Sequence, residues 1–236
     1  MKVSTDLHIH SCLSPCGDEA MTPFDLVGMS LLNGRRLIAL TDHNTARNCA
    51  AAAVAAAAYG VGFIPGIEVT TSEDIHAVCL FPSVESALEF DAFLYSLLPD
   101  IPNRPEIYGR QILYGSDGEP CGEEPRLLIT GCGISILELP GVIEGYGGLC
   151  YPAHIDREGN GLMSILGSWP AELRVGAAEL SPRSLMAAPS AEPGIPEGIR
   201  LISASDAHRL QDLPGEGFDL DLESVDFRGL AKLLGA

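Results

Sequence analysis

The stretch RLIALTDHNTARNCAAAAVAAAAYGVGFIPGIEV, residues 36–69, places two short apolar runs on either side of a long run of alanines. The apolar runs, Arg36–Thr41 and Gly62–Val69, have the length and composition of buried strands. The alanine-rich segment Arg47–Tyr59 predicts a helix, because alanine has the highest helix propensity, and Gly60 is placed to end it. A strand, a helix and a strand in this order predict parallel strands with a covering helix.

The same alternation continues on both sides of this stretch. Lys2–Leu7 predicts the first strand, and Thr22 and Pro23 are placed to begin a helix that ends near Leu32. Ile75–Phe81 predicts a fourth strand, and Ser83 is placed to cap the helix that follows. The remaining predictions are helices over Ser135–Tyr146 and Ser224–Leu234, and strands over Gly148–Ala153, Val175–Leu180 and Ile199–Ala204.

Two segments interrupt this rhythm. Residues 99–126 are rich in proline, glycine and charge and predict an irregular insertion or lid, and Pro182–Pro196 predicts a loop. The sequence shows no internal repeat and no domain boundary. We therefore expect a single α/β domain over residues 1–236, built as a barrel of about seven strands.

The composition excludes several classes of protein. The formal net charge is -18, so the chain has no general electrostatic attraction to nucleic acid or to anionic membranes. Lysine occurs only as Lys2 and Lys232, outside every motif, which argues against a Schiff-base lysine, a phosphate-loop lysine or a carbamylated-lysine metal bridge. The seven cysteines are odd in number and form no C-x-x-C pair, so neither a disulfide framework nor a structural zinc knot is predicted, and we expect a reduced, cytoplasmic setting.

All six histidines lie in short polar motifs beside apolar, strand-like runs. The histidines lie in DLHIH (6–10), TDHN (41–44), IHA (75–77), PAHID (152–156) and SDAH (205–208), and a further motif, GIEVT (66–70), adds the acid Glu68. In parallel barrels the carboxyl ends of the strands meet on one face, so these motifs are expected to converge. Six imidazoles with two or three carboxylates exceed the needs of one tetrahedral ion, which predicts two or three divalent ions of zinc, manganese or iron.

This ordered set of motifs resembles the PHP (polymerase and histidinol phosphatase) domain family of metal-dependent phosphoesterases. The residues that carry the resemblance are DLHIHSCLSP, ALTDHNT, PGIEVTT, IHAVCLF, PAHID and SASDAH, which span residues 6–208 in the family's order. The resemblance implies a distorted (β/α)7 barrel that holds two or three metal ions.

The resemblance also assigns ligands to three ions. It implies that the first ion is held by His8, His10, Glu68 and Asp206, the second by His43 and His208, and the third by His76 and His154 with Glu68 as the bridge. The chain departs from the family's pattern at Pro15 and Cys16, where an acid or histidine usually serves the second ion. Cys16 is retained as a candidate ligand through its thiolate, with Asp18 as the alternative.

Two other residues are expected to act beside the metals. Asp42 is expected to orient a ligand, and Arg157, three residues after His154, is expected to bind the phosphate of a substrate because lysine is so scarce. The predicted activity is hydrolysis of a small phosphate ester, such as a nucleotide or a sugar or amino-alcohol phosphate, by a metal-bound hydroxide. The alternatives are a metal-binding regulatory module with reduced catalysis and an amidohydrolase-like hydrolase of C–N bonds. The sequence predicts neither a long nucleic acid nor a membrane as a partner, and it leaves the oligomeric state open.

Overall fold

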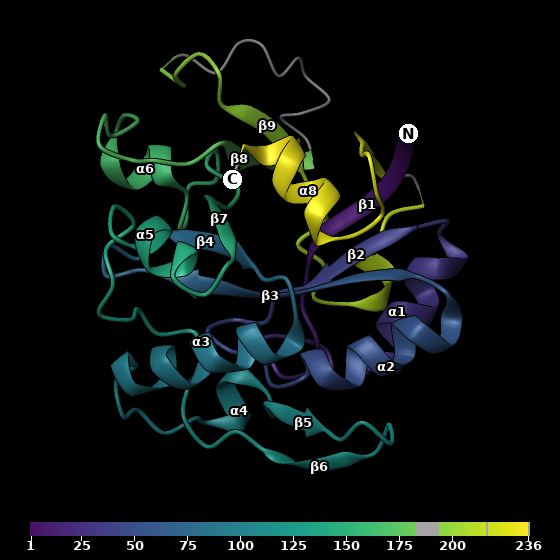
Figure 1. Ribbon diagram of the computed structural model, residues 1–236. Coiled ribbons are helices and arrows are strands. Elements are labelled where there is room, and N and C mark those ends of the chain that lie inside the picture. The colour runs from purple at the N-terminus through teal and green to yellow at the C-terminus, as the bar shows by residue number, and fades with distance from the viewer. Residues whose placement is uncertain (183–193, 216, 236) are drawn as a thin grey trace.

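A curled, six-stranded mixed sheet forms the centre of the molecule, in a computed structural model that describes residues 1–182, 194–215 and 217–235 (Figure 1). Its strand order is β10-β1-β2-β3-β4-β7. These strands are β1 (Lys2–Ile9), β2 (Leu37–Leu40), β3 (Gly62–Thr70), β4 (His76–Leu80), β7 (Leu149–Pro152) and β10 (Phe218–Asp221). A separate parallel pair, β8 (Ala177–Leu180) and β9 (Arg200–Ser203), approaches β1 through a bridge between Ile9 and Ala207, so the strands form a half-barrel.

The predicted seven-stranded parallel barrel is only partly confirmed. β1, β2 and β3 are parallel, but β4 is antiparallel to β3, and β7 is antiparallel to β4. The reason is the short connection over residues 71–75, because a parallel crossover needs a dozen residues or more. As a result, β4 begins at the same edge of the sheet at which β3 ends.

Three long helices cover one side of the sheet, as Figure 1 shows. They are α1 (Pro23–Leu32), α2 (Cys49–Tyr59) and α3 (Val84–Leu97). The predicted signals are confirmed: Thr22 and Ser83 accept backbone hydrogen bonds at the starts of α1 and α3, and Gly60 ends α2 with a φ of 74°. None of the helices in the described residues is long and apolar enough to cross a membrane.

The helix α8 (Phe227–Leu234) lies on the other side of the sheet (Figure 1). Its Leu230 and Leu234 pack with Val3, Leu7 and Tyr151 in a core inside the half-barrel. A second and larger core fills the space between the sheet and α1–α3.

Several elements differ from the sequence-based predictions. The segment 99–126 is not wholly irregular, because it contains α4 (Pro105–Tyr108) and a hairpin of β5 (Ile112–Tyr114) and β6 (Pro120–Glu123). The helix predicted over residues 135–146 is shortened to α5 (Leu139–Glu144), and the sequence analysis missed α6 (Leu162–Leu166), the 3-10 turn η2 (Leu210–Asp212) and β10. The loop predicted over residues 182–196 lies largely outside the described residues.

The segment 99–126 packs against the two loops that follow β1 and β2. The Ile112 N–H donates to the carbonyl of Cys12 at 2.9 Å, and the Cys16 N–H donates to the carbonyl of Tyr108 at 2.8 Å. The Asn48 amide, which follows β2, donates to the carbonyl of Ile112 at 3.1 Å. The segment therefore forms one wall beside the loops that carry His10 and His43.

Candidate metal centre

The polar motifs meet at one edge of the sheet, as their placement beside the strands predicts. His8 lies near the end of β1, Glu68 lies near the end of β3, and His76 is the first residue of β4. The other candidates lie in the loops just after strands: His10 after β1, His43 after β2, His154 after β7, and Asp206 and His208 after β9. His8, His10 and Glu68 are fully buried, and His43, His76 and His154 nearly so.

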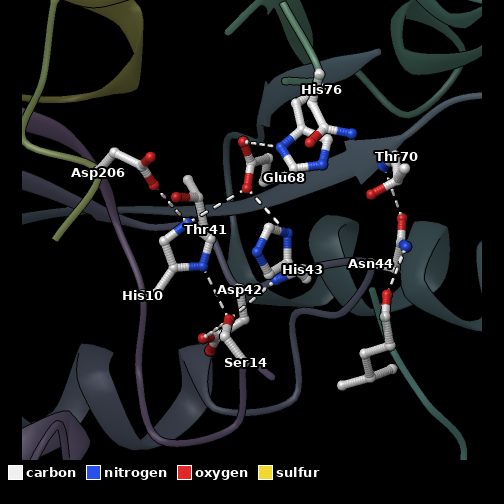
Figure 2. Close-up of polar contacts among 12 residues, drawn as sticks. His10, Ser14, Thr41, Asp42, His43, Asn44, Glu68, Thr70, His76 and Asp206 are labelled. Atoms are coloured by element: carbon white, nitrogen blue, oxygen red, sulfur yellow. Dashed lines mark hydrogen bonds and ion pairs between the residues drawn. The ribbon is translucent and has the colours of Figure 1, made fainter. Parts of the chain in front are cut away.

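Glu68 lies at the centre of this cluster. Its carboxylate is 0% exposed and faces the imidazoles of five histidines. The distances from its oxygens are 3.2 Å to His8 Nε2, 3.3 Å to His10 Nε2, 2.9 Å to His43 Nδ1, 2.9 Å to His76 Nδ1 and 3.1 Å to His154 Nε2. Figure 2 shows the carboxylate of Glu68 between the rings of His10, His43 and His76. Such a carboxylate is placed to bridge more than one cation.

Three sets of side chains bring their potential ligand atoms within 4.8 Å of one another. They are His8, His10, Glu68 and Asp206; His10, His43 and His208; and His43, Glu68 and His76. The first set has the same members as the ligand set implied for the first ion. The second set contains His43 and His208, as implied for the second ion, and adds His10. The third set contains His43 in place of His154, so the assignment of His154 to the third ion stays a prediction.

The donor atoms at this centre suit cations better than they suit one another. Within the described part of the chain, Glu68 Oε2, Asp206 Oδ1, His43 Nδ1 and His154 Nδ1 are buried without a hydrogen-bond partner. His43 Nδ1 lies 2.9 Å from a Glu68 oxygen. Buried polar atoms without partners are costly, and divalent cations would satisfy both carboxylate oxygens and imidazole nitrogens. The residues present therefore fit a metal centre.

The pKa shifts at the centre reflect burial and opposite charge. Burial acts to lower the pKa of His10, but the negative charges of Asp206 and Glu68, which lie close to its Nε2, raise it to about 9. Burial acts to raise the pKa of Glu68, but the surrounding histidines hold it well below its usual range. Burial lowers the pKa of His43 to about 3 and that of His208 to about 4. Without a metal, protonated histidines therefore compensate the buried carboxylates.

Glu179 is a buried acid, not predicted from the sequence, that contacts the imidazole of His8. Both carboxylate oxygens of Glu179, in β8, lie within 3.1 Å of His8 Nδ1. With its proton on Nδ1, His8 would donate a hydrogen bond to this carboxylate. The other ring nitrogen, Nε2, then keeps a free lone pair that faces Glu68 and Asp206. Glu179 could have been suspected from sequence, because it interrupts the apolar strand Ala177–Leu180 as Glu68 interrupts its own.

Asp42 reaches the centre through a serine. The Ser14 hydroxyl donates to Asp42 Oδ1 at 2.7 Å and lies 2.8 Å from His10 Nδ1 (Figure 2). Asp42 also accepts the backbone N–H and the hydroxyl of Ser11, each at 2.7 Å. The hydroxyl of Ser14 can therefore accept a hydrogen bond from the Nδ1–H of His10. This tautomer leaves Nε2 free to bind a cation. Ser14 carries no sequence signal of this role, since a serine in a loop is common.

Replacing Glu179 with Gln should lower the affinity for the metal roughly tenfold, because the neutral amide stabilises the metal-directed form of His8 less well. Titration of the metal-free protein with zinc or manganese by calorimetry measures this change. The matched control is Glu172→Gln, since Glu172 is exposed outside the centre. Equal affinity in the wild-type and Glu179→Gln proteins would remove Glu179 from the support of the site.

Three other predicted residues, Cys16, Asp18 and Arg157, are more exposed than the buried ligand cluster. Cys16 is exposed, adopts a left-handed backbone with a φ of 68°, and belongs to none of the three ligand sets. Asp18 is exposed too, although its N–H donates to the carbonyl of His208 at 2.9 Å. The guanidinium of Arg157 pairs with Asp206 and is 50% exposed, so it lies at the rim of the centre. Arg157 thus contacts a residue of the first ligand set, whereas Cys16 belongs to none of the three sets.

Comparison with known proteins gives one partial sequence match. No protein-family model matches the chain. A stretch of 73 residues, 31% of the chain, is 41% identical to the 3′,5′-nucleoside bisphosphate phosphatase of Chromobacterium violaceum. This stretch spans only 25% of that enzyme.

The fold is similar to those of solved structures over nearly the whole chain. A lesion-specific endonuclease from Pyrococcus furiosus matches with a TM-score of 0.67 at 19% identity, over 99% of this chain and 56% of that protein. A protein from Bifidobacterium adolescentis named as a metal-dependent phosphoesterase matches with a TM-score of 0.55 at 18% identity, over 97% of this chain and 94% of that protein. At such identities the similarity establishes the fold.

Proposed function

We propose that this chain, which is PHP-like in its motifs and in its fold, is a metal-dependent phosphoesterase whose centre includes Glu68. The observation that supports this most strongly is the buried carboxylate of Glu68 among five imidazoles. The partial identity with a phosphatase is consistent with it. Residues 1–236 are proposed to form one catalytic domain, in which the segment 99–126 shapes the pocket.

The proposed ligands are the eight residues that converge at the sheet edge. They are His8, His10, His43, Glu68, His76, Asp206 and His208, which form the three ligand sets, and His154, which contacts Glu68. Two or three divalent ions of zinc, manganese or iron fit their mixed nitrogen and oxygen donors. Bound divalent ions would lower the pKa of water and neutralise charge on phosphoryl oxygens. The protein fixes the donors through Glu179 behind His8 and Ser14 behind His10.

Arg157 is proposed to bind the phosphate of the substrate from the rim of the centre. Its guanidinium is paired with Asp206 but remains half exposed, so it can also reach an incoming anion. Arg157→Ala should raise the KM for a phosphate ester roughly tenfold while kcat changes less, because a charge-assisted hydrogen bond to the substrate is lost. Steady-state kinetics with metal content measured in parallel test this prediction.

The control for this variant is Arg228→Ala, since Arg228 is exposed on α8 on the other side of the sheet. An unchanged KM in Arg157→Ala, at full metal content, would remove Arg157 from the substrate site. A fall in metal content alone would show that Arg157 acts only on Asp206.

We propose a small phosphorylated substrate, with nucleoside 3′,5′-bisphosphates as the first class to test. The formal net charge of -18 disfavours a long polyanion. A nucleic-acid substrate is the second candidate, because the endonuclease fold matches over 99% of the chain. A duplex that contains an abasic lesion is its natural probe, as a related endonuclease Q has been solved with such a duplex.

Phosphate release from a panel of esters, with added manganese or zinc, separates these candidates. Release from nucleoside bisphosphates and no cutting of the lesion duplex supports the small-substrate proposal. Cutting of the duplex alone would contradict it. Hydrolysis of cyclic amides without hydrolysis of esters would favour the amidohydrolase alternative, and metal binding without any turnover would favour a regulatory module.

A further inference from the structure

Two cysteines outside the metal centre face each other across neighbouring strands. Cys79 of β4 is the direct partner of Cys150 of β7 in the antiparallel register. Directly opposed residues in such a pair project from the same face of the sheet. Here that face packs against the larger core, which contains Cys79 and is contacted by Cys150.

The hydrogen-bond pattern shows which kind of pair this is. The Ala153 N–H donates to the carbonyl of His76 at 2.9 Å, which marks Ala77 and Pro152 as a non-hydrogen-bonded pair. The two kinds of pair alternate along the strands, so Cys79 and Cys150, two positions further along, also form a non-hydrogen-bonded pair. Such pairs typically have Cα atoms about 4.5 Å apart, within the range of about 4.4–6.8 Å found in disulfides.

The two thiols differ in their access to solvent. Cys79 is fully buried, and burial together with a hydrogen bond to the Cys150 thiol raises its pKa well above the usual range. Cys150 is only partly buried and lines an open groove with Glu138, Pro140 and Leu173. A small oxidant would therefore reach Cys150 first, and the Cys79 thiol lies beside it.

We propose that Cys79 and Cys150 form a reversible disulfide when the protein meets hydrogen peroxide. Peroxide oxidises the Cys150 thiol to a sulfenic acid and releases one water; the Cys79 sulfur then attacks the Cys150 sulfur, the S–S bond forms, and the hydroxyl leaves with the Cys79 proton as a second water. A dithiol reductant reverses the step by thiol–disulfide exchange. This pair is compatible with the absence of a disulfide framework, because both cysteines are free in the reduced protein.

The position of the pair links it to the metal centre. β4 begins at His76, three residues before Cys79, and β7 leads into His154, four residues after Cys150. The bond would therefore join the two strands that place these histidines beside Glu68. It would also close a long loop of chain, which limits the freedom of the unfolded state. The proposal does not depend on the phosphoesterase activity.

Peptide mapping of the whole chain of residues 1–236 tests the proposal. The protein is treated with hydrogen peroxide, quenched with catalase, alkylated under denaturing conditions and digested without reduction for mass spectrometry. We expect a linked peptide that joins Cys79 to Cys150 and disappears after dithiothreitol treatment. The oxidised protein should also melt roughly 5 °C higher than the reduced protein, because its unfolded state is constrained.

Cys150→Ser should lose both the linked peptide and the shift in Tm, whereas the matched control Cys121→Ser should keep both, since Cys121 is exposed on β6. The map of the wild-type protein decides the matter even if a variant folds poorly. Alkylated Cys79 beside over-oxidised Cys150 would overturn the proposal. A bond from Cys150 to Cys132, whose thiol is close enough to influence Cys79, would overturn it as well.

Discussion

Glu68→Gln is expected to lower phosphoester hydrolysis by on the order of 10³-fold or more and to lose the tightest metal binding. The side chain is fully buried, and both of its oxygens face imidazoles that are candidate ligands. Glutamine keeps the size of the side chain but replaces one charged oxygen with an NH₂ group, which cannot bind a cation. The substitution therefore removes a charge and a bridging ligand without opening a cavity.

Turnover of a phosphate ester and metal content, measured on the same preparation, test this expectation. Glu89→Gln is the matched control, because Glu89 is exposed on α3, and it should keep both properties. A far-ultraviolet spectrum shows whether the Glu68 variant is folded. A folded Glu68→Gln protein with wild-type turnover would contradict the proposed role of Glu68.

Metal affinity is expected to rise about 100-fold or more between pH 7 and pH 9, with His10 alone supplying about 100-fold. The pKa of His10 is raised to about 9, so this histidine carries a proton at neutral pH in the metal-free protein and loses it as the pH rises through about 9. The pKa of His8 is raised as well. A cation binds only the neutral imidazole, so each proton that it displaces increases the affinity about tenfold per pH unit.

Protonation of His10 weakens metal binding, but it stabilises the metal-free fold. The pKa of His10 is raised above its ordinary value of about 6.5, so its contribution to stability is full below that pH and is lost as the pH rises through about 9. The Tm of the chelated protein should therefore fall between pH 6.5 and pH 9.5.

Calorimetry in buffers with different ionisation enthalpies would detect protons that are released when the metal binds at pH 7. Affinity that stays flat from pH 7 to pH 9 would contradict this explanation.

Local signals predicted much of the first half of the fold. The Thr22 cap, the Ser83 cap and the Gly60 stop act within one helical turn, so the sequence alone locates these helix ends. The sheet edge at which the histidine motifs meet was also predictable, because each motif borders an apolar run. The direction of β4 was not predicted, although the short connection over residues 71–75 excludes a parallel crossover.

The remaining parts depend on contacts between distant residues. Glu179 reaches His8 across 171 positions of sequence, and Ser14 joins His10 to Asp42 only when two loops pack together. β10 pairs with β1 from the other end of the chain, and its alternating polar residues give a weak strand signal. The grouping of His43 with Glu68 and His76 likewise follows from ring positions, which the order of the motifs does not specify.

Phosphate release from a nucleoside 3′,5′-bisphosphate should be measured before chelation, after it and again after manganese or zinc is restored. This measurement tests whether the cluster around Glu68 hydrolyses phosphate esters through bound cations. The chelator should abolish the release, and the added ion should restore it. Release that persists in protein shown to be free of metal would contradict the claim that the histidine and carboxylate cluster around Glu68 acts through bound cations.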